Sequence, residues 1–323
     1  MKKALLIGVN DYPKPCRLRG CLEDIKQVRD AIERNGDGSK NFDVMMLSDI
    51  RAGVEAMAYI EELFKGDSET ALLYFSGHGY ANLTDAELVF PEDVGAYYKG
   101  IKMSDILAVA SHSNVRNKVI VLDCCHSGQM GKFHISDNEA AIASGVSILT
   151  ACRADESAME CGGHGLFTEQ FCNALRGGAA DFCGNITIGG IYTYIDRSFG
   201  QWEQRPTFKT NVTEFAPLKN VEPKVSESII RQLTSLFVAP DVELALDPSF
   251  EYTNSLEFEH RLVEPYATEE NVGRFKVLQK LQSIGFVEPV EEEFMYWAAM
   301  HSKSCRLTSL GQYYWRLVND GRI

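Results

Sequence analysis

The sequence has 323 residues, of which 45% are hydrophobic and 24% charged, and its formal net charge at pH 7 is −13. This length accommodates one large or two ordinary domains, and the apolar content is sufficient for a buried core. The acidic balance argues against non-specific binding to nucleic acid or anionic membranes, because both carry negative charge themselves. It would instead attract basic peptide segments.

The cysteines and the apolar runs lead us to expect a cytoplasmic protein. Nine cysteines form no regular framework and no CxxC pair, which favours a reducing compartment and argues against structural zinc. The apolar run at residues 4–9 is interrupted by Asn10 and Asp11, so we expect a buried first strand there rather than a signal peptide. No apolar run approaches the roughly 20 residues that span a bilayer.

The first two thirds of the chain alternate between short apolar runs and amphipathic segments. The apolar runs predict strands at residues 3–9, 43–47, 70–75, 119–122, 146–151 and 206–215. The amphipathic segments predict a helix that follows from residues 18–24 and ends at about residue 34, and further helices at residues 55–64, 104–110, 167–175 and 187–199. An edge strand or hairpin arm is expected at residues 87–91. This alternation predicts an α/β fold, with a doubly wound, mostly parallel sheet flanked by helices.

The last third of the chain has a different pattern. Pro217, Pro223 and the polar residues between them predict a linker, so we expect domains at residues 1–218 and 219–323. Helical patterns dominate the second domain, including an amphipathic stretch at 274–284, and their order is similar to a winged helix. From residue 220 onward, 10 Lys and Arg face 16 Asp and Glu, which is the wrong balance for binding phosphates. We therefore expect a regulatory or protein-docking module.

Reactive side chains follow two of the predicted strands at the point where each strand ends. Residues 71–75 run into Ser-Gly-His-Gly, and residues 119–122 run into Asp-Cys-Cys-His-Ser-Gly. Ligands bind beyond the carboxyl ends of parallel strands, so neighbouring strands would bring His78 together with Cys124 or Cys125. A thiol beside a histidine is an activated nucleophile. Backbone N–H groups of Gly79 and of the nucleophile could stabilise an oxyanion.

These motifs resemble the caspase-like clan of cysteine proteases, and specifically its metacaspase branch. The metacaspase pattern D-x-C-H-S-G makes Cys125 the nucleophile, and His78 lies 47 residues before it. The caspase signature Q-A-C-[RQG]-G is absent. Residues 18–24, 165–168 and 204–208 extend the resemblance over about residues 1–216.

The resemblance implies a primary specificity pocket as well as a catalytic dyad of His78 and Cys125. Its pocket positions correspond to Cys21, Asp24, Ser76 and Asp123. Two carboxylates in a partly desolvated pocket demand a cation, so we expect an endopeptidase that cleaves protein substrates after Arg or Lys. Taken without the resemblance, Asp24 is an ordinary residue of a helix start and Asp123 a cap of the following turn. Cys124 is interpreted as a small buried hydrophobe.

Calcium is the point at which the sequence departs from the family pattern. Many metacaspases hold Ca²⁺ through an acidic cluster after the histidine motif. Here the segment offers only Asp85, Glu87, Glu92 and Asp93, which are scattered, whereas hard-cation sites gather several oxygens in one loop. We expect no calcium requirement and no other cofactor.

Activation is expected to involve the segment after the nucleophile. Residues 127–138 are Gly-rich and polar, and Lys132 is the single Lys or Arg between Ser127 and Gly145. The matching segment of caspase-like proteases often obstructs the site until it is cut, so we expect cleavage after Lys132. The alternative is an uncut loop that reorders when a regulatory protein docks on the C-terminal domain.

Two other functions stay open from the sequence. One is a catalytically silent caspase-like scaffold that only binds. The other is a protease-linked regulator whose C-terminal winged helix binds DNA. By analogy alone, a cytoplasmic protease with an added docking module suits a bacterial stress or anti-phage pathway.

Overall fold

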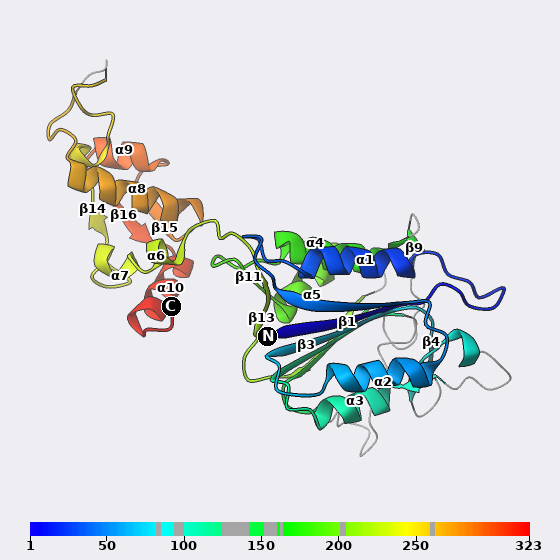
Figure 1. Cartoon of the computed structure of the whole chain (residues 1–323). Helices are drawn as coiled ribbons and strands as arrows, with labels where there is room; N and C mark the ends of the chain where they lie inside the picture. Colours follow the sequence, from blue (N-terminus) through cyan, green and yellow to red (C-terminus); the bar gives the residue numbers. More distant parts are fainter. Residues whose placement is uncertain are drawn as a thin grey trace. The chain divides into compact units, whose positions relative to one another are not determined.

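The computed structural model describes residues 1–81, 85–93, 100–124, 142–151, 160–161, 164–200, 205–258 and 262–323 (Figure 1). The chain forms two compact units, Met1–Glu222 and Pro223–Ile323. The boundary expected after residue 218 falls inside strand β13 (Pro217–Asn220), which pairs with β11 (Asn185–Thr187) and so belongs to the first unit. Within the described ranges, no helix has the length and apolar character needed to cross a membrane.

A six-stranded sheet forms the centre of the first unit, in the order β12-β8-β7-β3-β1-β2. Five strands are parallel, and the edge strand β12 is antiparallel to β8. Their bounds are β1 Lys2–Gly8, β2 Phe42–Ser48, β3 Thr70–Ser76, β7 Asn117–Asp123, β8 Val146–Thr150 and β12 Thr207–Asn211. The predicted doubly wound, mostly parallel sheet is therefore confirmed.

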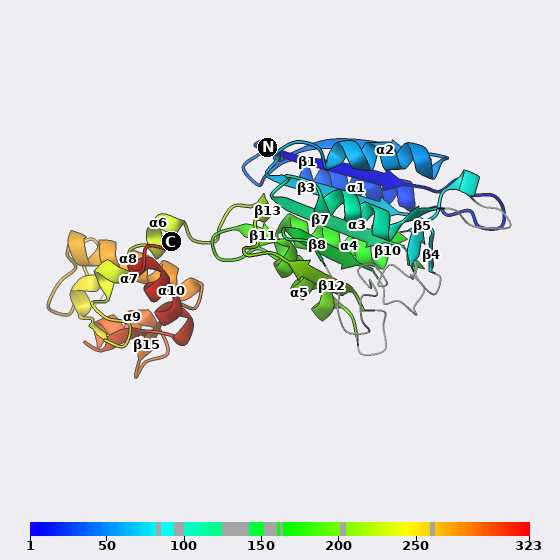
Figure 2. The same cartoon turned by 90° about the horizontal axis from the view of Figure 1, so that it is seen from below.

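Helices cover both faces of this sheet (Figures 1 and 2). One face carries α1 (Cys21–Ile32), α4 (Leu166–Asn173) and α5 (Ile188–Ser198), and the other carries α2 (Gly53–Leu63) and α3 (Met103–Ser111). Both faces are buried, which is why the strands read as continuous apolar runs rather than alternating ones. All seven residues of β3 are buried.

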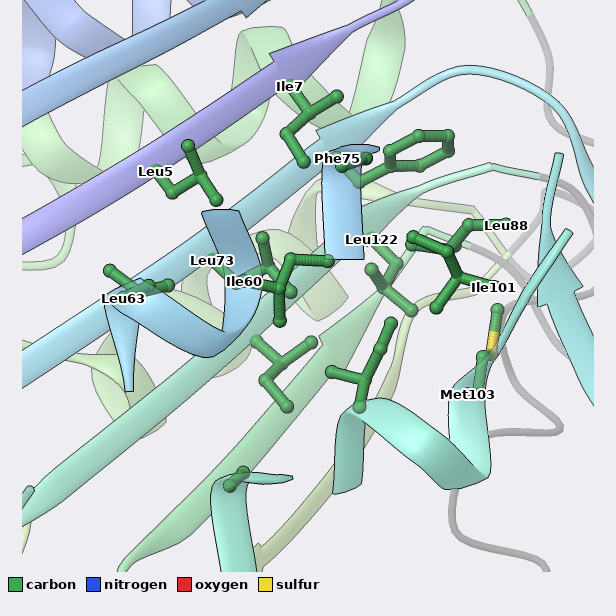
Figure 3. Close-up of a cluster of buried hydrophobic side chains, with 14 of the residues drawn as sticks. Leu5, Ile7, Ile60, Leu63, Leu73, Phe75, Leu88, Ile101, Met103 and Leu122 are labelled. Atoms are coloured by element: carbon green, nitrogen blue, oxygen red, sulfur yellow. The ribbon is translucent and has the colours of Figure 1, made fainter. Parts of the chain in front are cut away.

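Successive residues of each strand point into two separate cores because strand side chains alternate between faces. Leu73 and Phe75 pack toward α2 and α3, in the cluster drawn in Figure 3. Leu72 and Tyr74 pack toward α1, α4 and α5. Each fully buried Leu, Ile or Phe contributes about 1.5–3 kcal/mol, so the two cores fix the sheet and its register.

Small sheets complete the first unit. The strands β4 (Gly79–Ala81), β5 (Ala86–Leu88) and β6 (Ile101–Lys102) form an antiparallel sheet in that order. The hairpin arm expected at residues 87–91 overlaps β5, so it lies in this sheet rather than at an edge of the central one. A second hairpin joins β9 (Glu160–Cys161) to β10 (His164–Gly165).

The second unit combines helices with a three-stranded antiparallel sheet, ordered β14-β16-β15. Its elements are α6 Glu227–Ile230, α7 Leu233–Leu236, β14 Leu244–Ala245, α8 Glu269–Ser283, β15 Val287–Val290, α9 Met295–Met300, β16 Ser304–Leu307 and α10 Ser309–Asn319. The amphipathic stretch expected at 274–284 falls in α8, which begins five residues earlier behind the N-cap Thr268. The likeness to a winged helix stays a prediction.

Candidate active site

The register of the central sheet brings the two reactive segments to one edge. Ser76, the last residue of β3, pairs directly with Asp123, the last residue of β7. Gly8 at the end of β1 is the neighbour of Ser76 on the other side. The prediction that these strands are neighbours is confirmed.

Strand alternation separates Asp123 from the residue that follows it. The side chain of Asp123 lies on the face covered by α1 and α4, where it contacts Thr168. Cys124 is 1% exposed and packs in the opposite core with Leu122, which confirms its interpretation as a small buried hydrophobe. Cys125 and Lys132, the expected nucleophile and processing site, lie outside the described residues.

A closed ring of three hydrogen bonds holds the backbone of His78. The His78 N–H donates to Tyr12 Oη at 2.9 Å, and Tyr12 Oη donates to the carbonyl of Val89 at 2.8 Å. The Val89 N–H donates back to the His78 carbonyl at 3.0 Å. Burial raises the pKa of Tyr12 well above its ordinary value, so the phenol keeps the proton that this ring requires. The histidine backbone is thus fixed on both sides.

The loop between β1 and α1, which carries Tyr12 and Cys16, also orients the imidazole of His78. Its Nε2 lies 2.6 Å from the carbonyl oxygen of Cys16, and its ring centroid lies 4.5 Å from that of Tyr12. A carbonyl only accepts hydrogen bonds, so Nε2 carries the proton in this contact. In the neutral ring, Nδ1 is therefore the nitrogen with the lone pair. Nδ1 is the atom that can take a proton from a nucleophile.

The sequence gives no indication that Tyr12 has this role. An aromatic residue ahead of a proline in a loop carries no signal of burial. Its partners, His78 and Val89, are far away in the sequence, so only the folded chain shows the contact.

Asp24 is fixed at the start of α1 and points toward the end of β3. Its side chain is 3% exposed, and its Oδ2 accepts a hydrogen bond from Ser76 Oγ at 2.8 Å. Cys21 is also buried, and its N–H donates to Asn10 Oδ1 at 3.0 Å. The close approach of α1 depends on Gly8, where an added Cβ would lie 2.6 Å from the carbonyl oxygen of Cys21.

Asp123 is held by a side chain of α4. It is 8% exposed, and its Oδ2 accepts a hydrogen bond from Thr168 Oγ1 at 2.6 Å. The hydroxyl of Thr168 is also bonded to Tyr74 Oη. Burial raises the pKa of Tyr74 well above its ordinary value, and the nearby charges of Asp123 and Asp24 raise it further. Ser76 bonds Asp24 and pairs with Asp123 in the sheet, so three of the pocket residues expected from the sequence lie together.

Neither Thr168 nor Tyr74 carries a sequence signal of this contact. Thr168 lies in residues 165–168, which contribute only to the family resemblance. Tyr74 reads as one more residue of an apolar strand. Neither position shows its hydroxyl contact until α4 packs on β3.

Gly79 and Glu87 lie in the small sheet that follows His78, whereas Glu92 and Asp93 lie in a short 3-10 helix, Pro91–Asp93. Gly79 is the first residue of β4 and pairs with Leu88. Glu87 is 6% exposed, and its Oε2 accepts a hydrogen bond from the N–H of Gly100 at 3.0 Å. Glu92 pairs with Arg51 at 3.3 Å. The described ranges contain no group of three or more His, Cys, Asp or Glu able to hold a metal ion.

Comparison with known proteins gives a consistent result for the first unit. Residues 1–216 match a family model described as caspase domain. Metacaspase-6 of Arabidopsis thaliana is 27% identical over 224 residues, which cover 62% of this chain and 58% of that protein. Metacaspase-1B of Aspergillus fumigatus is 28% identical over 146 residues, which cover 39% of this chain and 35% of that protein. The chain thus matches about a third to a little over half of the length of these relatives.

A solved structure from Geobacter sulfurreducens resembles the chain more distantly. It aligns with a TM-score of 0.49 and 18% sequence identity, over 68% of this chain and 99% of that one.

Proposed function

Because the chain belongs to the caspase-domain family, we propose that it is a metacaspase-like cysteine protease that cleaves proteins after Arg or Lys through His78 and Cys125. The observation that supports this specificity is the pair of buried carboxylates, Asp24 and Asp123. They lie at the carboxyl ends of β3 and β7, close to the segment that carries His78. Each carboxylate accepts a hydrogen bond from a neighbouring hydroxyl. Such a pair is suited to a substrate cation.

The proposed reaction proceeds through an acyl-enzyme. Nδ1 of His78 takes the proton of the Cys125 thiol, and the sulfur attacks the carbon of the scissile carbonyl. Backbone N–H groups of Gly79 and Cys125 stabilise the oxyanion. The C–N bond then breaks, and the amine leaves with the proton from His78. Water attacks the thioester, His78 takes its proton, and the C–S bond breaks to restore the thiol. No step of this reaction uses calcium.

Substrate binding is proposed to depend on Asp24, Asp123 and Ser76, with Cys21 completing the pocket. On binding, the guanidinium or ammonium group of the residue before the scissile bond would lose its hydrating water and contact the side-chain oxygens of Asp24, Asp123 and Ser76 instead. Removing one partner of a desolvated charge pair costs about 2–5 kcal/mol. Asp123→Ala and Asp24→Ala should therefore each lower cleavage after Arg by orders of magnitude.

Control of the protease is proposed to rest either on the segment after Cys125 or on the second unit. In the first case, cleavage after Lys132 opens the pocket. In the second, a regulatory protein binds residues 223–323 and activates an uncut chain. A cytoplasmic setting in a bacterial stress or anti-phage response fits both cases by analogy.

Peptide-library profiling of the wild type beside Cys125→Ala and His78→Ala tests this function. We expect wild-type cleavage after Arg or Lys, and none by either variant although both fold. Cleavage after Asp alone would contradict the proposed pocket. A chain that an Arg-based thiol-reactive peptide fails to label would instead be a silent scaffold. Intact-mass measurement of active enzyme, together with the activity of Lys132→Ala, distinguishes the two forms of control.

A further inference from the structure

A chain of buried hydroxyl groups ends on one carboxylate of the proposed pocket. Tyr74 Oη is bonded to Thr168 Oγ1, and Thr168 Oγ1 is 2.6 Å from Asp123 Oδ2. Both hydroxyl-bearing residues are fully buried, Tyr74 in the central strand β3 and Thr168 in α4.

The direction of these hydrogen bonds follows from the number of protons. An ionised carboxylate only accepts, so the single hydroxyl proton of Thr168 is donated to Asp123. The bond between Tyr74 and Thr168 must then use the phenol proton. Burial raises the pKa of Tyr74, which keeps that proton in place. Two donors in series therefore point at Oδ2 of Asp123.

Packing leaves the two hydroxyl groups little freedom to move. The ring of Tyr74 stacks on Phe171 with centroids 6.3 Å apart, and Phe171 stacks on Phe167 with centroids 6.2 Å apart. Phe167 and Phe171 belong to α4 and flank Thr168 on that helix. The same helix thus fixes the Tyr74 ring and supplies the hydroxyl between Tyr74 and Asp123.

We propose that Thr168, supported by Tyr74, is a positioning residue that orients the carboxylate of Asp123 and thereby sets the preference for Arg over Lys. This inference rests on the proposed function, because it assumes that the substrate cation binds Asp123. A guanidinium group is a planar fork that needs its carboxylate in a fixed plane. An ammonium group is a point charge on a flexible stem and tolerates a rotated carboxylate.

The test compares Thr168→Val, which keeps the shape but loses the hydroxyl, with Thr168→Ser, which keeps the hydroxyl. Both are assayed on peptides that differ only by Arg or Lys before the scissile bond. For Thr168→Val, kcat/KM on the Arg peptide should fall about tenfold to hundredfold, the range expected for a lost hydrogen bond to a charged group. The loss should appear mainly in KM and should be smaller on the Lys peptide. Thr168→Ser should restore the Arg:Lys ratio.

Tyr74→Phe provides a second arm that does not depend on the folding of Thr168→Val. It should lower the Arg:Lys ratio by itself, and it should add nothing in the Thr168→Val background, since the Thr168 hydroxyl that it supports is already gone. Thr70→Val is the matched control. Thr70 is buried at the opposite end of β3, and its hydroxyl has no hydrogen-bond partner within the described part of the chain. This variant should keep the wild-type ratio.

The outcomes separate the inference from the function on which it rests. If the wild type prefers Arg and both Thr168→Val and Tyr74→Phe keep that preference, the positioning role is wrong and the proposed function stands. If the wild type itself cleaves after neither Arg nor Lys, the proposed function is wrong and the inference falls with it.

Discussion

At the scale of single residues, Tyr12 joins the N-terminal loop to the proposed catalytic histidine. Tyr12→Phe removes the oxygen that bonds both the His78 N–H and the Val89 carbonyl, while the aromatic ring stays. Leaving such buried groups without a partner costs about 1–3 kcal/mol each. We expect a lower free energy of unfolding and a fall in kcat/KM of about tenfold or more, measured by urea denaturation and peptide cleavage.

Tyr59→Phe is the control for this change, because Tyr59 lies on the exposed side of α2. Tyr59→Phe should change neither the free energy of unfolding nor kcat/KM. Wild-type cleavage kinetics in Tyr12→Phe would show that the ring of hydrogen bonds has no part in placing His78.

The buried thiol of Cys172 gives a pH prediction at the same scale. Burial raises its pKa from an ordinary value of 9.0 to about 12. Above pH 9 the thiol ionises in the unfolded chain but stays protonated in the folded one. The unfolded state then binds fewer protons, so the stability that this group contributes is complete below pH 9 and is lost between pH 9 and about pH 12.

Unfolding midpoints measured from pH 8 to pH 11 check this expectation. The decline should be shallower in Cys172→Ala than in the wild type. Equal slopes in the two proteins would mean that the folded and unfolded chains ionise Cys172 alike.

At the scale of elements, the close contact between β1 and α1 limits what Gly8 can become. In Gly8→Ala the new Cβ would lie 2.6 Å from the backbone oxygen of Cys21, so α1 has to move. Overpacking of this kind costs about 1–3 kcal/mol. Because α1 carries Asp24, we expect a lower melting temperature together with weaker cleavage after Arg.

Gly273→Ala offers a contrasting change inside α8, where an added Cβ meets no atom within 4 Å. In a helix interior, glycine makes the folded state about 0.5–1 kcal/mol less stable than alanine does, so this variant should be more stable than the wild type. Thermal melts of both variants give the comparison. If Gly8→Ala keeps the wild-type melting temperature and the wild-type cleavage after Arg, then α1 adjusts without moving Asp24.

The elements differ in how far the sequence could predict them. The strands of the central sheet and the pairing of β3 with β7 were predictable, because fully buried parallel strands leave long apolar runs that end in polar motifs. The small sheet β4-β5-β6 was only partly predictable, since two or three residues per strand leave almost no pattern. The supports of the site, Tyr12 and Thr168, were not predictable. They act through contacts between elements that are distant in the sequence.

At the scale of the whole molecule, the two hydrophobic clusters that hold the central sheet consist only of residues from the first unit. We therefore expect residues 1–222 to fold alone, with a cooperative unfolding transition close to that of the same unit in the full chain. Calorimetry of residues 1–222 and of the full chain measures the two unfolding transitions. A shortened chain without a cooperative transition would show that the first unit needs residues 223–323 for stability.

The opposite placement of Asp123 and Cys124 on the two faces of the sheet has a consequence for protein engineering. The supports of the acidic pocket, Ser76 and Thr168, lie on the side of α1 and α4, whereas Tyr12 and Val89, which hold the His78 backbone, lie in the core beneath α2 and α3. A library randomised on the first side could therefore be selected for new substrate preferences while His78, the proposed proton-transferring group, stays in place. Designers could treat the proposed recognition and cleavage steps as two separately adjustable parts.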